Sequence, residues 1–304
     1  MNSFDLIIIG SGPAGLSAAI YAARAELNFA VFDRSAVPGG QVQSTYEVDN
    51  YPGIPGVSGP ELSEKMRAHC DKLGVNFITE DIVNITREND LFTVTTSDNN
   101  NYTARAVIAA TGASHRKLEC PGEEELAGMG VSYCATCDGA FFRKRKCAVV
   151  GGGDVAFEDA IYLSKLARVV YLIHRRDGYR AAPTLVSQAK AVENIEFITD
   201  TVVKSINGSD MVESLTLSNV KTGETSNLEV DGIFIATGII PVNVLFGKLA
   251  DCDESGYIKA NENCETSCPG LFVAGDLRTK QLRQIVTAAA DGANAVTSAI
   301  RFLG

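Results

Sequence analysis

The sequence contains fewer basic than acidic residues. It has 27 Lys and Arg against 37 Asp and Glu, which gives a formal net charge of −10 at pH 7. DNA and RNA bind to faces rich in Lys and Arg, because these residues replace the counterions of the phosphates. The acidic balance therefore argues against nucleic acid as a main partner.

The sequence also lacks an uninterrupted apolar run. The run from Leu6 to Ala23 follows Asp5, has no basic residue before it, and is interrupted by three glycines and a proline. A secretory signal needs a positively charged start, and a membrane helix needs about 20 consecutive apolar residues. We therefore expect no membrane partner. No other targeting signal is evident, so we expect a cytoplasmic location.

A second pair of metal ligands is missing as well. Cys134 and Cys137 form a CxxC pair, but the sequence has no other CxxC and no CxxH or HxxxH. Tetrahedral zinc sites usually need such a second pair, so metal binding is the weaker alternative for this motif and we predict no metal. Cytosolic thiols are normally reduced, which predicts ordinary thiols at the remaining cysteines. These are Cys70, Cys120, Cys147, Cys252, Cys264 and Cys268.

The CxxC pair has the context of a redox motif. It lies in the segment SYCATCDG (132–139), with Asp138 directly after the second cysteine. A CxxC near a nucleotide-binding βαβ pattern is typical of thiol–disulfide chemistry, and its surroundings can lower the pKa of one thiol. Asp138 is a candidate proton carrier. The alternative for Asp138 is an acid that starts a helix or a turn.

A dinucleotide fingerprint opens the chain. An apolar strand is predicted at Phe4–Ile9, followed by GSGPAG (10–15), a small-residue helix from Leu16 to Ala25, and a second strand from Phe29 that ends in Asp33. Such glycines let a pyrophosphate approach the helix N-terminus, and the acid binds a ribose hydroxyl. An acid at this position suits a free 2′-hydroxyl, as in FAD or NAD, and would repel a 2′-phosphate.

The same pattern occurs a second time. Cys147–Val150 is predicted as a strand, GGGDVA (151–156) as the turn, a helix follows, and Val169–Ile173 is predicted as the second strand. A basic cluster replaces the acid here: His174, Arg175, Arg176 and Arg180. Guanidinium groups match the geometry of a phosphate, so this unit is predicted to prefer NADPH. The alternative is a solvated surface cluster.

The repeated unit defines the predicted fold class. At 304 residues the chain is long enough for two domains. Each βαβ unit is followed by β-rich sequence and an apolar strand ending in Ala-Thr-Gly, at 110–112 and 236–238. A last strand, PGLFVAGD (269–276), precedes a helix predicted from about Gln284 to Arg301. The pattern predicts an α/β protein with two Rossmann-like units.

Together these motifs resemble the low-molecular-weight thioredoxin reductases over essentially the whole chain. The shared motifs are GSGPAG, GGQ (39–41), the two ATG segments, CATCDG (134–139), GGG (151–153), HRRDGYR (174–180) and PGLFVAGD. The resemblance implies two Rossmann-like, three-layer ββα domains. An FAD domain, 1–112 and 243–304, is split by an inserted NADPH domain, 113–242, that carries the CxxC.

The resemblance also implies an activity and a set of site residues. Electrons would pass from NADPH through FAD and a Cys134–Cys137 disulfide to thioredoxin or another small dithiol redoxin. Cys137 would face the flavin, Cys134 would attack the partner, and Asp138 would carry the proton. The family is typically homodimeric, and its NADPH domain turns about connections that fall near 112–117 and 238–243 here.

The implied FAD-binding residues are Gly10, Ser11, Gly12, Pro13, Ala14, Gly15, Asp33, Arg34, Gly39, Gly40, Gln41, Val42, Asn50, Val83, Ala110, Thr111, Gly112, Gly275, Asp276, Arg283, Gln284 and Ile285. The implied NADPH-binding residues are Gly151, Gly153, Asp154, Val155, Ala156, His174, Arg175, Arg176, Arg180 and Ile239.

Three other functions use a similar fold. A flavin dithiol oxidase or ferredoxin-linked reductase keeps the CxxC but lacks the arginine cluster. A ferredoxin–NADP reductase lacks the CxxC. A non-catalytic FAD-binding redox sensor would not turn over NADPH with a disulfide substrate.

Overall fold

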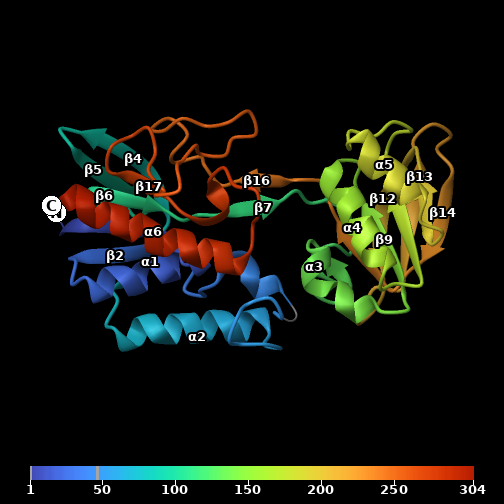
Figure 1. Ribbon diagram of the computed structural model, residues 1–304, viewed down its shortest axis with the longest axis horizontal. Coiled ribbons are helices and arrows are strands. Elements are labelled where there is room, and N and C mark those ends of the chain that lie inside the picture. The colour runs from blue at the N-terminus through green and yellow to red at the C-terminus, as the bar shows by residue number, and fades with distance from the viewer. Residues whose placement is uncertain (1, 46–47) are drawn as a thin grey trace. The chain divides into compact units, whose positions relative to one another are not determined.

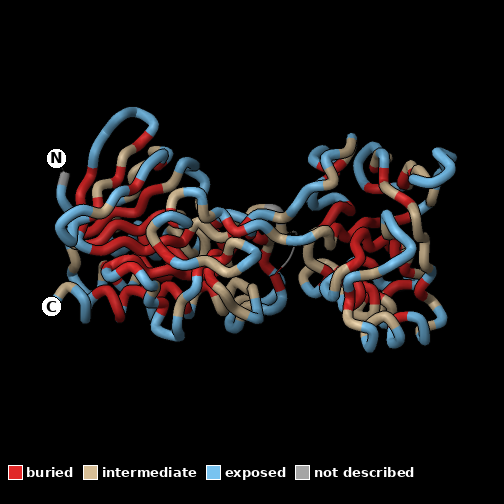
Figure 2. The backbone as a smooth tube through the Cα atoms, turned by 90° about the horizontal axis from the view of Figure 1, so that it is seen from above, coloured by how far each residue is buried: buried red, intermediate tan, exposed pale blue. Residues whose placement is uncertain are grey.

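Parallel β-sheets form the centre of both halves of the chain. The computed structural model describes residues 2–45 and 48–304 (Figure 1). The chain divides into two units. The first consists of the N-terminal segment up to Gln43, Val48–Ser114 and Ile240–Gly304, and the second contains His115–Ile239. Buried backbone is concentrated in the interior of each unit (Figure 2). The α/β class predicted from the sequence is confirmed.

The first unit contains a seven-stranded sheet in the order β3-β2-β1-β6-β5-β4, with β17 also pairing with β6. β1, β2, β3, β6 and β17 are parallel, whereas β4 and β5 are antiparallel to their neighbours. The strands are β1 Asn2–Ile9, β2 Phe29–Asp33, β3 Phe77–Thr79, β4 Ile82–Glu88, β5 Leu91–Thr96, β6 Asn101–Ala109 and β17 Leu271–Val273.

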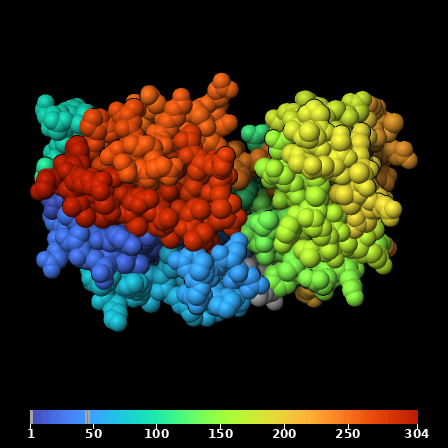
Figure 3. Space-filling view, viewed as in Figure 1, coloured from blue at the N-terminus to red at the C-terminus, as the bar shows by residue number. Residues whose placement is uncertain are grey.

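Three helices belong to this unit: α1 Pro13–Arg24, α2 Gly59–Lys72 and α6 Ile285–Leu303. Small residues on α1 and α6 allow these helices to pack against each other and on one face of the sheet. The N-terminal and C-terminal segments therefore lie side by side on the surface of this unit (Figure 3). Residues of the segment around Phe246 and Ile258 cover the opposite face.

The helix starts show what the sequence patterns missed. α1 begins at Pro13, three residues before the predicted start, because a proline at the first helical position already has a helical φ. α4 likewise begins at Asp154, directly after the glycine turn. Sequence analysis names no helix at α2, although Ser58 caps it by accepting a hydrogen bond from the Glu61 backbone N–H at 3.2 Å.

The second unit has three layers. A parallel sheet, in the order β11-β10-β9-β15-β8, lies between helices α4 and α5 and an antiparallel sheet, β12-β13-β14. Alternate residues of β9 point to opposite faces, so Cys147 and Val149 pack on the helical side and Ala148 and Val150 on the other side.

The strands of this unit are β8 Val131–Ser132, β9 Lys146–Val150, β10 Val169–Ile173, β11 Ile195–Ile198, β12 Thr201–Asn207, β13 Ser214–Asn219, β14 Thr225–Glu229 and β15 Gly232–Ile235. Its helices are α3 Ala135–Asp138, α4 Asp154–Ser164 and α5 Pro183–Lys190. The short 3-10 helix η2 (Gly139–Phe142) also lies in this unit. Two further 3-10 helices lie in other parts of the chain, η1 at Gly40–Ser44 and η3 at Gly275–Leu277.

The chain passes between the units twice, and the two connections pair. β7 (Ala113–His115) and β16 (Ile239–Pro241) form a two-stranded sheet. Backbone hydrogen bonds extend the pairing on both sides, from Val242 N–H to Gly112 at 3.0 Å and from Arg116 N–H to Gly238 at 2.9 Å. None of the helices in the described part of the chain is both long enough and apolar enough to cross a membrane.

Candidate functional site

Cys134 and Cys137 are joined by a disulfide, with the two Cα atoms 5.3 Å apart. The short helix α3 creates this proximity. Cys134 is its N-cap in an extended conformation, and its carbonyl accepts hydrogen bonds from the N–H groups of Cys137 and Asp138 at 3.2 and 3.1 Å. One turn of helix therefore brings the two sulfurs together. The pairing implied by the sequence resemblance is confirmed.

Asp138 is a half-buried carboxyl beside this disulfide. Its Oδ2 accepts a hydrogen bond from Ser132 Oγ at 2.6 Å, and its buried Oδ1 has no hydrogen-bond partner among the described residues. Burial raises the pKa of Asp138, and the Ser132 hydrogen bond opposes part of that rise. A carboxyl of this kind retains its proton to higher pH than an exposed aspartate, as a proton carrier requires.

Ser132 is a site residue that the sequence analysis missed. It is buried at the end of β8, where its Oγ accepts a hydrogen bond from Cys134 N–H at 3.1 Å while donating to Asp138. The same side chain therefore positions both the first cysteine and the carboxyl. A serine two residues before CxxC carries no signal by itself, because the contact depends on the turn from β8 into α3.

The other cysteines are free thiols, as predicted. Burial raises the pKa of Cys70 and Cys147 to about 12 and that of Cys120 and Cys264 to about 11. Near neutral pH these thiols are protonated and therefore poor nucleophiles. No group of three or more His, Cys, Asp or Glu side chains within residues 2–45 and 48–304 could hold a metal ion.

The first glycine turn is the predicted phosphate cradle. Gly10 has φ +106°, and a Cβ there would lie 2.4 Å from the Ala110 carbonyl oxygen, so no other residue fits. A Cβ on Gly12 would have only one neighbour, at 3.9 Å, which leaves open space beside the helix N-terminus. Asp33 Oδ2 accepts hydrogen bonds from both Ser11 N–H and Ser11 Oγ at 2.7 Å, which ties the end of β2 to this turn.

Several other candidate FAD residues contact this turn or other residues of the first unit. Gly39 N–H donates to Ser11 at 2.8 Å, and Gln41 donates to the Ala113 carbonyl. Gly275 lies against the first turn of α1, because a Cβ on Gly275 would be 3.0 Å from that of Ala14. Asn50 and Gln284 meet through a 2.9 Å side-chain hydrogen bond. Arg34 and Val83 are exposed, and among the described residues neither side chain forms a hydrogen bond or ion pair with this group.

The turn after β17 carries buried polar atoms that would suit a polar ligand. Asp276 Oδ1 and Arg283 Nε are buried and make no hydrogen bond within the described chain. Burial raises the pKa of Asp276, while Lys280 and Arg283 oppose the rise. The Arg283 guanidinium also lies over the Tyr257 ring, 4.0 Å from its centroid. The cradle, Asp33 and these unsatisfied atoms together fit a flavin dinucleotide.

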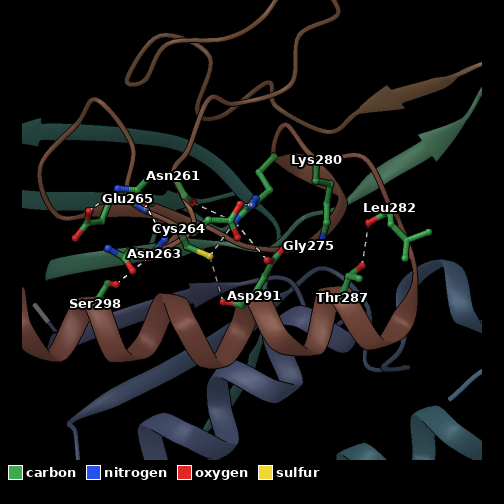
Figure 4. Close-up of polar contacts among 12 residues, drawn as sticks. Asn261, Asn263, Cys264, Glu265, Gly275, Lys280, Leu282, Thr287, Asp291 and Ser298 are labelled. Atoms are coloured by element: carbon green, nitrogen blue, oxygen red, sulfur yellow. Dashed lines mark hydrogen bonds and ion pairs between the residues drawn. The ribbon is translucent and has the colours of Figure 1, made fainter. Parts of the chain in front are cut away.

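A buried ionic cluster holds this turn in place (Figure 4). Asp291 on α6 accepts a hydrogen bond from Gly275 N–H at 3.0 Å and pairs with Lys280 at 2.6 Å and Arg278 at 3.4 Å. The side chains of these three charged residues are less than a tenth exposed. No pattern in the sequence predicts this cluster.

The second glycine turn has the basic loop folded onto it. The His174 ring covers Gly152, since a Cβ there would be 2.2 Å from the ring. Arg180 N–H donates to the Gly152 carbonyl at 2.8 Å, and Ala182 N–H donates to Asp154 Oδ1 at 2.7 Å. Burial lowers the pKa of His174, and the neighbouring arginines lower it further.

The loop therefore brings the predicted NADPH residues to one end of the sheet. Arg175, Arg176 and Arg180 are exposed, and none of the ion pairs in the described part of the chain uses them. Val155 is exposed and Ala156 is buried on the first turn of α4, whereas Ile239 lies in β16. These free guanidinium groups fit an anionic ligand at the turn.

Comparisons with known proteins cover nearly all of the chain. A model of the pyridine nucleotide-disulphide oxidoreductases matches residues 4–292. A thioredoxin reductase of Listeria innocua is 46% identical, over 99% of this chain and 94% of that protein. A bifunctional thioredoxin reductase/thioredoxin of Mycobacterium leprae is 44% identical, over 98% of this chain and 66% of that protein. The crystal structure of a Streptococcus pyogenes thioredoxin reductase is 45% identical with a TM-score of 0.93, covering 99% of this chain and 98% of that one.

Proposed function

The chain belongs to the pyridine nucleotide-disulphide oxidoreductase family, and we propose on this basis that it is an NADPH-dependent thioredoxin-disulfide reductase. Electrons pass from NADPH through FAD and the Cys134–Cys137 disulfide to oxidised thioredoxin or a similar small redoxin. One observation supports this most directly: the closed CxxC disulfide lies beside a carboxyl of raised pKa. That carboxyl belongs to the same unit as the arginine-lined nucleotide turn.

The first unit, proposed as the FAD domain (1–112 and 243–304), holds the flavin dinucleotide. The turn at Gly10–Gly15 would hold the pyrophosphate, Asp33 would bind the adenosine ribose, and Asp276 would bind the ribityl chain. Bound FAD supplies the step that joins a two-electron hydride donor to a disulfide. The buried, unsatisfied oxygen of Asp276 supports this placement, because a buried polar atom without a partner is costly.

The second unit, proposed as the NADPH domain (113–242), distinguishes its nucleotide by charge. Arg175, Arg176 and Arg180 lie in the loop after β10, whereas in the first unit the corresponding strand β2 ends in Asp33. Guanidinium groups bind a 2′-phosphate, whereas a carboxylate repels it. The arginines also favour this reading over a ferredoxin-linked reductase of the same fold.

The cysteines then exchange disulfides with the partner. In the dithiol form, the Cys134 thiolate attacks one sulfur of the partner's disulfide, forming a mixed disulfide and releasing the partner's second sulfur as a thiolate. Cys137 attacks the Cys134 sulfur, which restores the Cys134–Cys137 disulfide and releases the first partner sulfur. The two protons of the dithiol end on the partner's thiols. Asp138 holds one of them between steps.

The proposal extends to the setting of the enzyme. We propose a homodimer in the cytoplasm. The Mycobacterium leprae relative is named a bifunctional thioredoxin reductase/thioredoxin, which supports thioredoxin as the partner.

Anaerobic absorbance spectroscopy tests the proposed function. Under nitrogen, NADPH should bleach the yellow purified protein, and oxidised thioredoxin should restore its colour. Bleaching without recovery would leave the protein an NADPH-oxidising flavoprotein without thioredoxin reductase activity. A non-catalytic FAD-binding redox sensor would show neither repeated turnover of NADPH nor thioredoxin reduction.

A further inference from the structure

Five exposed basic residues form one surface in the second unit. Arg143, Lys144 and Arg145 lie in the turn after η2, and Lys165 and Arg168 lie in the turn after α4. We call these five residues the basic surface. None of them takes part in an ion pair within the described part of the chain. Such a concentration of unpaired positive charge is unexpected in a chain of net charge −10.

Two hydrogen bonds fix the turns against each other. Lys144 N–H donates to the Leu166 carbonyl at 2.8 Å, and Arg168 N–H donates to the Arg145 carbonyl at 2.8 Å. The adjacent Lys146 is already neutralised, because it pairs with Glu229 at 3.2 Å. Cations after a helix stabilise its C-terminus, which accounts for Lys165 and Arg168. It does not account for the three cations of the other turn.

The basic surface is at the wrong end of the sheet for the nucleotide. β9 begins at Lys146, directly after this turn, and ends at Val150, directly before the Gly151 turn. Nucleotides bind beyond the carboxyl ends of parallel strands, and the basic surface lies at the amino end. A five-residue strand separates the two ends by about 16 Å. NADPH bound at the glycine turn therefore leaves these charges free.

The path from the disulfide to the basic surface is short and exposed. α3 and η2 connect Cys137 to Arg143 without interruption. Six residues of such helix rise by about 9–12 Å. Thr136 in α3, Ala140 in η2 and Arg143 directly after η2 are all exposed. This exposed segment leads from the CxxC to the basic surface.

A protein that reaches Cys134 would therefore meet the basic surface. A standard protein interface buries about 800 Å² on each partner, which is a patch about 30 Å across. A patch of this size, centred on the CxxC, extends past Arg143. DNA is a poorer match, because the rest of the chain is strongly acidic and repels a long polyanion.

We propose that the basic surface binds carboxylates on the redoxin, close to the disulfide that Cys134 attacks, and accelerates its association. This proposal rests on the proposed function. The partner is then a redoxin with an acidic rim around its dithiol. Charges at the edge of an interface mainly raise the association rate, so their effect should weaken as salt is added.

A triple variant tests the proposal: Arg143→Gln, Lys144→Asn and Arg145→Gln. Asparagine is chosen because Lys144 has φ +61°, which asparagine tolerates. With a purified bacterial thioredoxin at low salt, kcat/KM should fall about tenfold and kcat should change little. At about 0.5 M salt the variant and the unaltered protein should converge.

A matched control removes three positive charges elsewhere: Lys190→Gln, Lys204→Gln and Lys248→Gln. These side chains are exposed and outside the basic surface. The control should keep nearly all of its kcat/KM for thioredoxin. Equal losses in both variants would show that net charge, and not this surface, sets the rate, and would overturn the proposal.

Two further measurements separate the proposal from the proposed function. The neutral disulfide 4,4′-dithiodipyridine should be reduced equally well by all three proteins, which also shows that the variants fold. A thioredoxin whose carboxylates around the dithiol are changed to amides should lose the difference between variant and unaltered protein.

Failure of the unaltered protein to reduce either disulfide with NADPH would refute the proposed function itself. Normal thioredoxin kinetics in the triple variant would refute only the role of the basic surface. The proposal would also be overturned if the unaltered protein bound duplex DNA, the triple variant did not, and the triple variant reduced thioredoxin at the normal rate.

Discussion

At the scale of single residues, the most informative feature is a carboxyl with a hydrogen-bond partner on only one of its two oxygens. Asp138 accepts one hydrogen bond through Oδ2 and none through its buried Oδ1. Burial raises the pKa of Asp138, so the proton is bound below that raised value and lost as the pH rises through it. Ser132 limits this effect by stabilising the charged form.

Ser132→Ala should move the pH dependence of catalysis. Loss of the hydroxyl donor destabilises ionised Asp138, so the pKa of Asp138 should rise further and the alkaline limb of kcat/KM should shift to higher pH. The lost hydrogen bond should also cost about 1 kcal/mol of stability. Turnover measured between pH 5 and 9 checks the shift, and Ser132→Thr should restore the original profile. If Ser132→Ala lowered stability but left the pH profile of kcat/KM unchanged, Ser132 would have only a structural role.

Serine substitutions at the two cysteines should have different effects on the reaction with thioredoxin. In Cys137→Ser, Cys134 can attack an oxidised thioredoxin, but no neighbouring thiol resolves the product, so a stable mixed disulfide should accumulate. Cys134→Ser should form much less of it. Non-reducing gel electrophoresis with a thioredoxin lacking its own resolving cysteine measures the adduct. The reverse result would exchange the roles of the two sulfurs.

At the scale of elements, sequence patterns predict local structure best at positions whose immediate contacts permit only one type of residue. The Gly10 turn and the strand Val169–Ile173 appear as predicted, because a close carbonyl and a buried parallel pairing leave little choice. α2 was missed because its apolar residues are few. The Ser132 contact and the Asp291 cluster were missed because each joins residues from different elements, which only the folded chain brings together.

Asp291→Asn should show what the cluster contributes. The substitution leaves buried Lys280 without a carboxylate and Arg278 with only the exposed Glu262, 3.7 Å away, so it should reduce the free energy of unfolding by about 3–5 kcal/mol. Urea unfolding measures the change. As a control, Glu61→Gln breaks the exposed pair with Lys65 and should cost about 0.5 kcal/mol or less. Similar values for both would mean that the cluster is effectively solvated.

The loop after β10 should determine the choice of nucleotide. Each arginine–phosphate contact contributes about 1.5–3 kcal/mol, so Arg175→Ala with Arg176→Ala should raise the KM for NADPH by one or more powers of ten. The KM for NADH, which has no 2′-phosphate, should change far less. Steady-state kinetics with both nucleotides give the ratio. An equal rise for both would remove the arginines from 2′-phosphate recognition.

At the scale of the whole molecule, the same glycine turn is used twice with opposite charge beside it. Asp33 ends β2 in one unit, and Arg175 and Arg176 follow β10 in the other. We expect each unit thereby to favour a different nucleotide, because the acid suits a free 2′-hydroxyl and the arginines suit a 2′-phosphate. The sequence predicts this difference in charge, because an acid ends the second strand of the first repeat and arginines follow the second strand of the other.

The purified protein should therefore contain FAD and not FMN. Asp33 and the Gly10–Gly15 cradle have a use only if the flavin carries an adenosine diphosphate half. Heat release and chromatography of the flavin identify it, and Asp33→Ala should lower the fraction of protein that retains it. Recovery of FMN alone would contradict the assignment of the first unit.

Because the two connections pair with each other, the second unit begins and ends at neighbouring points. Its two ends are held together by the bonds of Arg116, whose N–H donates to Gly238 at 2.9 Å and whose carbonyl accepts from Thr237 Oγ1 at 2.7 Å. A segment whose ends are neighbours can be grafted into the surface loop of another protein, or closed into a ring, without stretching its backbone. Transplanted at β7 and β16, residues 115–239 would bring the disulfide, the arginine loop and the basic surface together as one piece.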